Sequence, residues 1–331
     1  MGNHKELVLS RASTGIPGER YRYGIGEWYG RSFLQLSPIE RRQMAETHML
    51  PAKERPDLPC LPRGGSVPCN KEGGVCSLRL YRESSDSGEV SVSPGVQGRL
   101  VVTCPQRFAE GGVIYQWIGN EILGHPEPLI VGEVGFLERE ASPLAEPEVN
   151  LAREDVGRID NVLVHPMRDP MLWCALEIQA VYFSGPAMLH EFRAILAHGD
   201  SLPFPVRMRR PDFRSSGPKR LMPQLQIKVP TLRRWGKKMA VVVDESFFDA
   251  LGHMDSVKDV SNADIAWFVV RFAESAKGAK LEQAFVHLTT LERAVEGLTA
   301  GRPVSLETFE ARIRAKLGRA SAGPPSSPDC G

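Results

Sequence analysis

Residues 171–185, MLWCALEIQAVYFSG, form a nearly continuous apolar run that two polar residues, Glu177 and Gln179, interrupt. An apolar run of this kind between turn signals predicts a strand that is buried on both faces of a sheet. Burying a carboxylate there is costly unless it is paired with a cation or bound to a metal. The stretch therefore predicts a central strand and raises the question of which partner Glu177 has.

The segment before this strand supplies a second acidic residue. Asp160 belongs to an apolar run at 159–165, and two X-Pro pairs between 165 and 170 predict a turn between the runs. In an antiparallel hairpin, directly opposite residues are about 4.5–5.5 Å apart, so Asp160 would lie close to Glu177. Strand alternation places Glu177 and Gln179 on the same face.

Two interpretations of this acidic pair remain open from the residues alone. Carboxylates at such a separation repel each other, and Mg²⁺ would relieve the repulsion while leaving positions for water and phosphate oxygens. The alternative is a buried ion pair between Glu177 and Arg158 or Arg168.

Composition limits the class of protein. The chain has 331 residues, of which 42% are hydrophobic and 24% are charged, with a formal net charge of +1. These values are typical of a soluble globular protein of about two domains. We expect a cytoplasmic protein without a membrane span, because the sequence has neither a run of about 20 apolar residues nor the apolar region of a signal peptide.

The pattern along the chain predicts an α/β domain after residue 113. A capping box, with Ser37 as N-cap and Glu40 three residues later, predicts an earlier helix up to Met49. Further strands are predicted at 129–137, 239–244 and 266–273, and helices at 111–124, 186–196, 231–237, 280–298 and 305–318.

Four of the six cysteines cluster in a Pro- and Gly-rich region: Cys60, Cys69, Cys76 and Cys104. Disulfides are rare in the cytosol, so the cluster favours a structural zinc or iron site with four thiolate ligands. The spacing differs from the C-x₂-C pairs of a zinc ribbon. Unrelated reduced thiols or disulfides are the alternatives.

A basic stretch follows the central strand. Between Arg207 and Lys238 there are eleven Lys or Arg residues and one acidic residue, Asp212. Such a local excess is typical of a surface that binds phosphate groups, although it is also compatible with a solvated face. The sequence therefore indicates nucleic acid as a partner. The candidate DNA-binding residues are Arg207, Arg209, Arg210, Arg214, Lys219 and Arg220.

Several motifs occur in an order that resembles the NotI-type restriction endonucleases. They are GIGEWYG (24–30), TCPQRF after the cysteines (103–108), GEVGF (132–136), LEIQAVYFSG (176–185) and MAVVVDESFFDAL (239–251). The pattern Asp160…Glu177-x-Gln179 is similar to the PD-(D/E)xK nuclease motif, with Gln in the position of the usual Lys. Around Asp160 the match is limited to the Asp and the apolar pattern.

The resemblance implies a three-layer α/β/α restriction-endonuclease-like core with a mixed sheet and an inserted four-cysteine module that holds iron. It implies a homodimer that cuts a palindromic, GC-rich site in double-stranded DNA with Mg²⁺ and leaves 5′-phosphate and 3′-hydroxyl ends. Asp160, Glu177 and Gln179 match the catalytic trio, and Glu133 matches an additional acidic residue. An ordinary surface role for Glu133 remains the alternative.

These observations lead to one main hypothesis, a Mg²⁺-dependent, sequence-specific type II DNA endonuclease without an organic cofactor. Asp160, Glu177 and the carbonyl of Ile178 would hold the metal, Glu133 would assist, and Gln179 would position the attacking water. The expected organisation is an N-terminal helical arm (1–55), the cysteine module (56–105), the nuclease core (106–318) and a disordered tail (319–331). The rivals are a non-catalytic DNA-binding protein and a repair or structure-specific nuclease.

Overall fold

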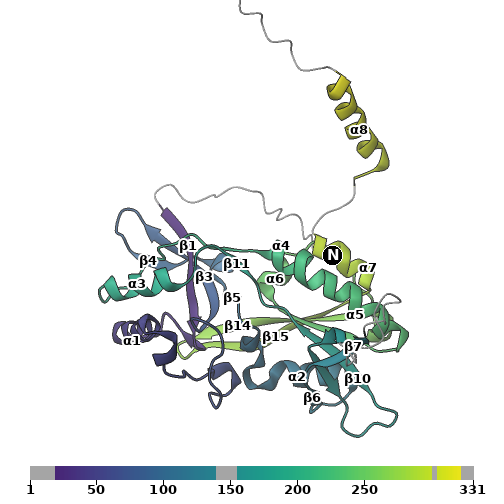
Figure 1. Cartoon of the computed structure of the whole chain (residues 1–331), viewed down its shortest axis with the longest axis horizontal. Coiled ribbons are helices and arrows are strands. Elements are labelled where there is room, and N and C mark those ends of the chain that lie inside the picture. The colour runs from purple at the N-terminus through teal and green to yellow at the C-terminus, as the bar shows by residue number, and fades with distance from the viewer. Residues whose placement is uncertain (1–18, 139–154, 300–303, 322–331) are drawn as a thin grey trace, which may run out of the picture.

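The computed structural model describes residues 19–138, 155–299 and 304–321 (Figure 1). Parts of the predicted N-terminal arm and C-terminal tail, residues 1–18 and 322–331, lie outside the described residues. Within the described ranges, no helix is both long enough and apolar enough to cross a membrane.

The N-terminal part forms a small antiparallel sheet, in which β1 and β3 pair along most of their length. Its strands are β1 (Glu19–Trp28), β2 (Arg31–Ser32), β3 (Val75–Ser84), β4 (Val90–Val92) and β5 (Val101–Val102). Helix α1 (Pro38–Met49) begins at Ser37, whose hydroxyl accepts a hydrogen bond from the Glu40 N–H, and Glu40 completes the capping box. The predicted start of this helix is therefore confirmed.

The main sheet has six strands in the order β15-β14-β13-β10-β9-β6. These are β6 (Leu129–Val131), β9 (Asn161–Val164), β10 (Trp173–Ile178), β13 (Met239–Asp244), β14 (Ile265–Ser275) and β15 (Gly278–Thr289). Strand β13 runs parallel to β10 and β14, whereas the remaining pairs are antiparallel. The sheet is thus mixed, as predicted.

Two two-stranded ribbons join this sheet to its surroundings. They are β7 (Val134–Glu138) with β8 (Asp155–Ile159), and β11 (Phe183–Ser184) with β12 (Arg210–Pro211). The second ribbon is part of the segment that connects the centre of the main sheet with the helices above it.

Helices cover both faces of the main sheet, which confirms the mixed α/β class (Figure 1). The remaining α-helices are α2 (Val113–Ile118), α3 (Leu189–Ala197), α4 (Phe213–Ser216), α5 (Met222–Arg234), α6 (Glu245–Asp249), α7 (Leu291–Thr299) and α8 (Leu306–Ser321). The shorter helical turns are η1 (Ala52–Glu54), η2 (Leu61–Arg63), η3 (Gly95–Gly98), η4 (Pro105–Gly112), η5 (Gly119–Leu123), η6 (Gly217–Leu221) and η7 (Val260–Asn262).

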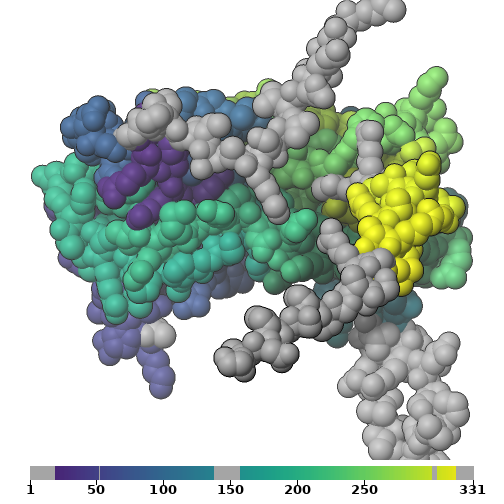
Figure 2. Space-filling model, turned by 90° about the horizontal axis from the view of Figure 1, so that it is seen from above, coloured from purple at the N-terminus to yellow at the C-terminus, as the bar shows by residue number. Residues whose placement is uncertain are grey.

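Alternation along β13 divides the core in two. Val241 and its odd-numbered neighbours pack against α5 and α7, while Val242 and Ala240 pack against α2 on the opposite face. Seen from above, the chain between α3 and α5 forms a teal-to-green band along the molecule (Figure 2).

Two sequence predictions in this part of the chain are wrong. Residues 280–298 do not form one helix, because the first part is strand β15, whose pairing with β14 extends from Ile265 to Ser275. Helix propensity is a weak preference that sheet pairing overrides. The predicted helix at 231–237 is also misplaced, because residues 222–234 form one continuous helix, α5, which begins earlier and ends at Arg234.

Candidate active site

Strand β10 brings Glu177 and Gln179 to the side of the sheet that faces α5. Ala175 belongs to the core cluster shared with α5, whereas Leu176 belongs to the cluster on the α2 face. Because side chains alternate along a strand, Glu177 and Gln179 point to the same side as Ala175. Their exposed fractions are only 3% and 7%. Both polar side chains are therefore buried at the end of a central strand.

Asp160 lies directly between β8 and β9, where the chain passes from the β7–β8 ribbon into the main sheet. The predicted hairpin is confirmed, since β9 pairs antiparallel with β10 and Asn161 lies opposite Leu176. This register brings Asp160 next to Glu177. The Asp160 side chain is 53% exposed, so the pair has one solvent-facing and one buried carboxylate.

The buried partner of Glu177 is Lys228 of α5. The Lys228 Nζ lies 2.7 Å from Glu177 Oε2 and 3.5 Å from Asp160 Oδ1, and it donates to Gln224 Oε1 at 2.9 Å. Neither of the two arginines suggested by the sequence fills this place. Arg158 instead pairs with Glu133, at 2.6 Å between Nη1 and Oε1.

The electrostatics of Glu177 reflect this crowding. Burial raises the pKa of Glu177 to about 7, the neighbouring Asp160 adds to the rise, and the Lys228 ammonium opposes it. One ammonium group is shared by two carboxylates. A further cation at this place would therefore relieve unbalanced negative charge.

These groups line one side of a cleft of about 840 Å³. Asp160, Glu177, Ile178, Gln179 and Gln224 belong to its lining. The opposite side comes from the N-terminal part of the chain, through Lys71, Glu72, Thr103 and Pro105. The cleft thus lies between the two sheets, and the end of β10 forms its floor.

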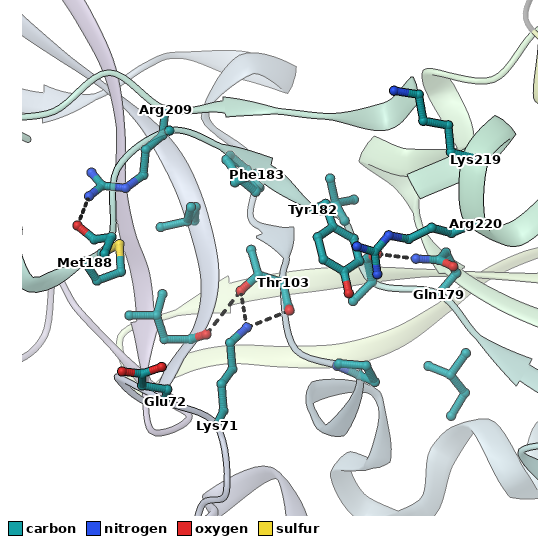
Figure 3. Close-up of a pocket in the computed structure, with 18 of the residues that line it drawn as sticks. Lys71, Glu72, Thr103, Gln179, Tyr182, Phe183, Met188, Arg209, Lys219 and Arg220 are labelled. Carbon is teal, nitrogen blue, oxygen red and sulfur yellow. Dashed lines mark hydrogen bonds between the residues drawn. The ribbon is translucent and has the colours of Figure 1, made fainter. Parts of the chain in front are cut away.

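Polar groups project into this cleft from several directions (Figure 3). The Arg220 guanidinium lies 3.4 Å from the centre of the Tyr182 ring. Lys71 donates to the carbonyl and the hydroxyl of Thr103, at 2.6 and 2.9 Å. The Gln179 Nε2 donates to the Ala180 carbonyl at 2.5 Å. No motif in the sequence predicts Lys71 as a site residue.

The basic residues after β11 divide into two groups. Arg207, Arg210, Arg214, Lys219 and Arg220 are exposed, and Lys219 and Arg220 border the cleft. Arg209 is a correction to the predicted set, because it is 4% exposed and forms an ion pair with the buried Glu191. Its guanidinium also donates to the Ala187 carbonyl. Its charge is therefore used within the protein.

Glu133 lies at the start of the β7–β8 ribbon. Val134 pairs with Ile159, so Glu133 and Asp160 stand at adjoining ends of these strands. Glu133 is exposed and is held by Arg158. It does not belong to the lining of the cleft.

The predicted four-cysteine metal module is not confirmed by the arrangement of its thiols. In the described ranges, no group of three or more His, Cys, Asp or Glu side chains is placed to hold a metal ion. The thiols of Cys60, Cys69, Cys76 and Cys104 are free. They nevertheless share one neighbourhood: Cys60 and Cys104 contribute to a raised pKa of Cys69, although burial is the main cause. The region is held together by backbone contacts, such as the Cys104 N–H donating to the Cys76 carbonyl at 3.2 Å.

Comparison with known families identifies a match for most of the chain. The family model described as restriction endonuclease NotI matches residues 43–283, which is more than two thirds of the 331 residues. The matched range includes the cysteines, the hairpin, β10, α5 and β13. No curated protein matches the chain.

Proposed function

Because the chain belongs to the restriction endonuclease NotI family, we propose that the cleft above the end of β10 is its catalytic site. Membership of the family makes the protein a sequence-specific type II restriction endonuclease that acts on double-stranded DNA. The observation that carries the assignment of the site is the acidic pair. Asp160 and Glu177 meet at the floor of the cleft, at one end of the central strand.

The donor groups fit a magnesium ion. Mg²⁺ favours carboxylate oxygens and keeps several positions for water and phosphate oxygens, so two carboxylates are sufficient. We assign its ligands to Asp160 and Glu177, with the Ile178 carbonyl as a third, and we assign Glu133 an assisting role from the adjoining ribbon. Bound there, Mg²⁺ would supply Lewis-acid stabilisation of the phosphate and acidify water at the site.

Under this assignment, the main sheet and its helices are a PD-(D/E)xK-type core in which Gln179 replaces the usual Lys. The buried Glu177 is the fixed member of the pair, while the exposed Asp160 is the member that the DNA reaches first. Gln179 has an amide group directed to the same face and would orient the attacking water through a hydrogen bond.

The reaction is the hydrolysis of one phosphodiester bond per strand. The water oxygen forms a bond to phosphorus as the P–O3′ bond breaks. The water releases one proton to solvent, and the departing 3′ oxygen takes one up. The products carry a 5′-phosphate and a 3′-hydroxyl, and two copies of the chain would act on the two strands of a palindromic, GC-rich site.

The exposed basic residues beside the cleft would hold the DNA backbone. Lys219 and Arg220 project from η6 at the edge of the cleft, and Arg207, Arg210 and Arg214 precede them along the chain. Contacts of this kind to phosphate fix the position of the duplex, and arginines can also read guanine in the major groove.

The structural metal remains a separate proposal. Three of the four thiols are buried and all four are free, which is compatible with a zinc or iron ion that draws the loops together. Metal analysis of the purified protein should then find about one such ion per chain, lost in Cys76→Ser. A protein that folds and cuts DNA without zinc or iron would rule this out.

Replacing Asp160 tests the catalytic assignment. Asp160→Ala should lower the Mg²⁺-dependent cleavage rate by about 100-fold or more, because it removes a ligand while leaving the DNA-binding surface intact. Cleavage is measured in a single turnover, and DNA affinity is measured without Mg²⁺. Asp249→Ala, which changes an exposed carboxylate of α6, is the matched control. Wild-type cutting by Asp160→Ala would refute the site.

A further inference from the structure

Lys228 lies at the acidic pair, and the motif of the family does not explain it. It comes from α5, 51 residues after Glu177 along the chain, and only 5% of it is exposed. Its ammonium group contacts the two carboxylates and the Gln224 amide oxygen. A buried charge is expensive, so its retention at this place requires a reason.

A purely structural ion pair does not account for the arrangement. One buried carboxylate would be sufficient to balance Lys228, yet the ammonium also faces Asp160, whose side chain is half exposed at the cleft. Gln224, one helical turn before Lys228, accepts a second hydrogen bond from the ammonium and also lines the cleft. The contacts therefore fix the ammonium at the boundary between the core and the cleft.

Gln179 cannot provide what Lys228 provides. Its amide carries no charge, and its Nε2 already donates to the Ala180 carbonyl. Glu177 and Gln179 face the α5 side of the sheet, and Lys228 approaches this same side from above. Lys228 on α5 therefore contacts the Glu177 carboxylate. In the usual motif, this carboxylate would be contacted by a lysine at position 179 of the chain.

We infer that Lys228 is a catalytic residue of this endonuclease, which supplies from α5 the ammonium group that the strand motif lacks. The inference rests on the proposed catalytic site. Before DNA and metal bind, Lys228 holds Asp160 and Glu177 together. When the carboxylates turn to the metal, its Nζ is released from them and donates a hydrogen bond to a non-bridging oxygen of the scissile phosphate, where negative charge develops.

The test replaces Lys228 with Met, which has a similar length and no charge. Two effects of opposite direction are expected. The single-turnover cleavage rate should fall by about 100-fold or more. The affinity for Mg²⁺, measured by calorimetry on the protein alone, should rise, because no ammonium competes for the carboxylates. Lys277→Met, in the exposed turn between β14 and β15, is the matched control.

Other outcomes separate a catalytic from a structural role. If Lys228→Met binds Mg²⁺ more tightly and cuts at the wild-type rate, Lys228 is only a counter-ion of the two carboxylates. This outcome overturns the inference. Weaker Mg²⁺ binding together with slower cutting indicates a structural role and also overturns it. If Lys228→Met does not fold, Lys228→Gln, which keeps a hydrogen bond to Glu177, carries the same test.

A double variant that moves the positive charge from the helix to the strand tests the inference by a gain of activity. In the double variant Gln179→Lys/Lys228→Met, the lysine returns to the strand, and cleavage should recover at least tenfold over Lys228→Met. Asp160→Asn and Glu177→Gln are measured beside it. If these two cut normally, the proposed site itself is wrong. If they are inactive while Lys228→Met cuts normally, only the role of Lys228 is refuted.

Discussion

At the scale of single residues, His48 illustrates how burial controls a titratable group. The His48 ring lies nearly parallel to the rings of Phe192 and Trp28, with ring centroids 4.5 and 5.7 Å away, and it forms a hydrogen bond with the Tyr29 hydroxyl. Burial lowers the pKa of His48 to about 4, and the nearby Arg55 contributes. The histidine therefore remains neutral in the folded protein under conditions in which it is protonated in the unfolded chain.

A pH dependence of stability follows from this shift. The unfolded chain, with an ordinary histidine pKa of about 6.5, binds more protons than the folded protein between pH 6.5 and pH 4. The stabilisation is therefore fully present above pH 6.5 and is lost as the pH falls toward 4. Between pH 6.5 and pH 4, we expect the free energy of unfolding of wild type to fall by about 3 kcal/mol more than that of His48→Phe. Denaturant unfolding at several pH values measures it, and parallel curves for the two proteins would contradict it.

The residue scale also shows what a sequence can predict about a site. Asp160 and Glu177 lie in one hairpin, so turn signals and alternation were sufficient to predict that they meet. Lys228 is far away along the chain, and only the packing of α5 on the sheet brings it to them. One of the two interpretations from the sequence paired Glu177 with Arg158 or Arg168, but Arg158 pairs with Glu133.

At the scale of elements, α5 explains why Lys228 was missed. Its buried residues are Leu225, Lys228, Val229, Thr231 and Leu232, and their helical spacing continues past Pro230. The helix predicted at 231–237 begins directly after Pro230, and proline is rare inside helices. In a continuous helix, Gln224 and Lys228 lie at i and i+4 and therefore on one face. This spacing is the sequence signal that would have predicted the contact between them.

Replacing this proline should stabilise the protein. Proline inside a helix removes a backbone hydrogen bond and is about 3 kcal/mol less favourable than alanine, although part of this gain is offset by the freer unfolded chain. Pro230 is exposed, so we expect Pro230→Ala to raise the free energy of unfolding by about 1–2 kcal/mol. Pro166→Ala, in the exposed turn between β9 and β10, is the control and should give no such gain. Denaturant unfolding measures both, and a less stable Pro230→Ala would disprove the argument.

At the scale of the whole molecule, the functional surface is assembled from distant segments. The cleft joins Lys71 and Thr103 of the N-terminal part with Gln179, the residue directly after β10, and with Arg220 of η6. No local pattern predicts such a meeting, because it depends on how the two sheets lie against each other. The net charge of +1 also conceals it, since the basic residues at the cleft are balanced by acids elsewhere on the chain.

The last prediction concerns the electrostatic contribution of this surface to DNA binding. Lys219 and Arg220 are exposed at the edge of the cleft. If both contact phosphates, Lys219→Gln/Arg220→Gln should release fewer counter-ions on binding. The slope of log affinity against log salt concentration should then become shallower by about 2, with weaker binding at low salt. The double variant Lys277→Gln/Lys280→Gln removes the same charge from the exposed β14–β15 hairpin, away from the cleft lining. Titrations without Mg²⁺ over about 50–200 mM salt measure both. Equal slopes for the two variants would mean that net charge alone acts, whereas a change confined to the first variant places the DNA at this cleft.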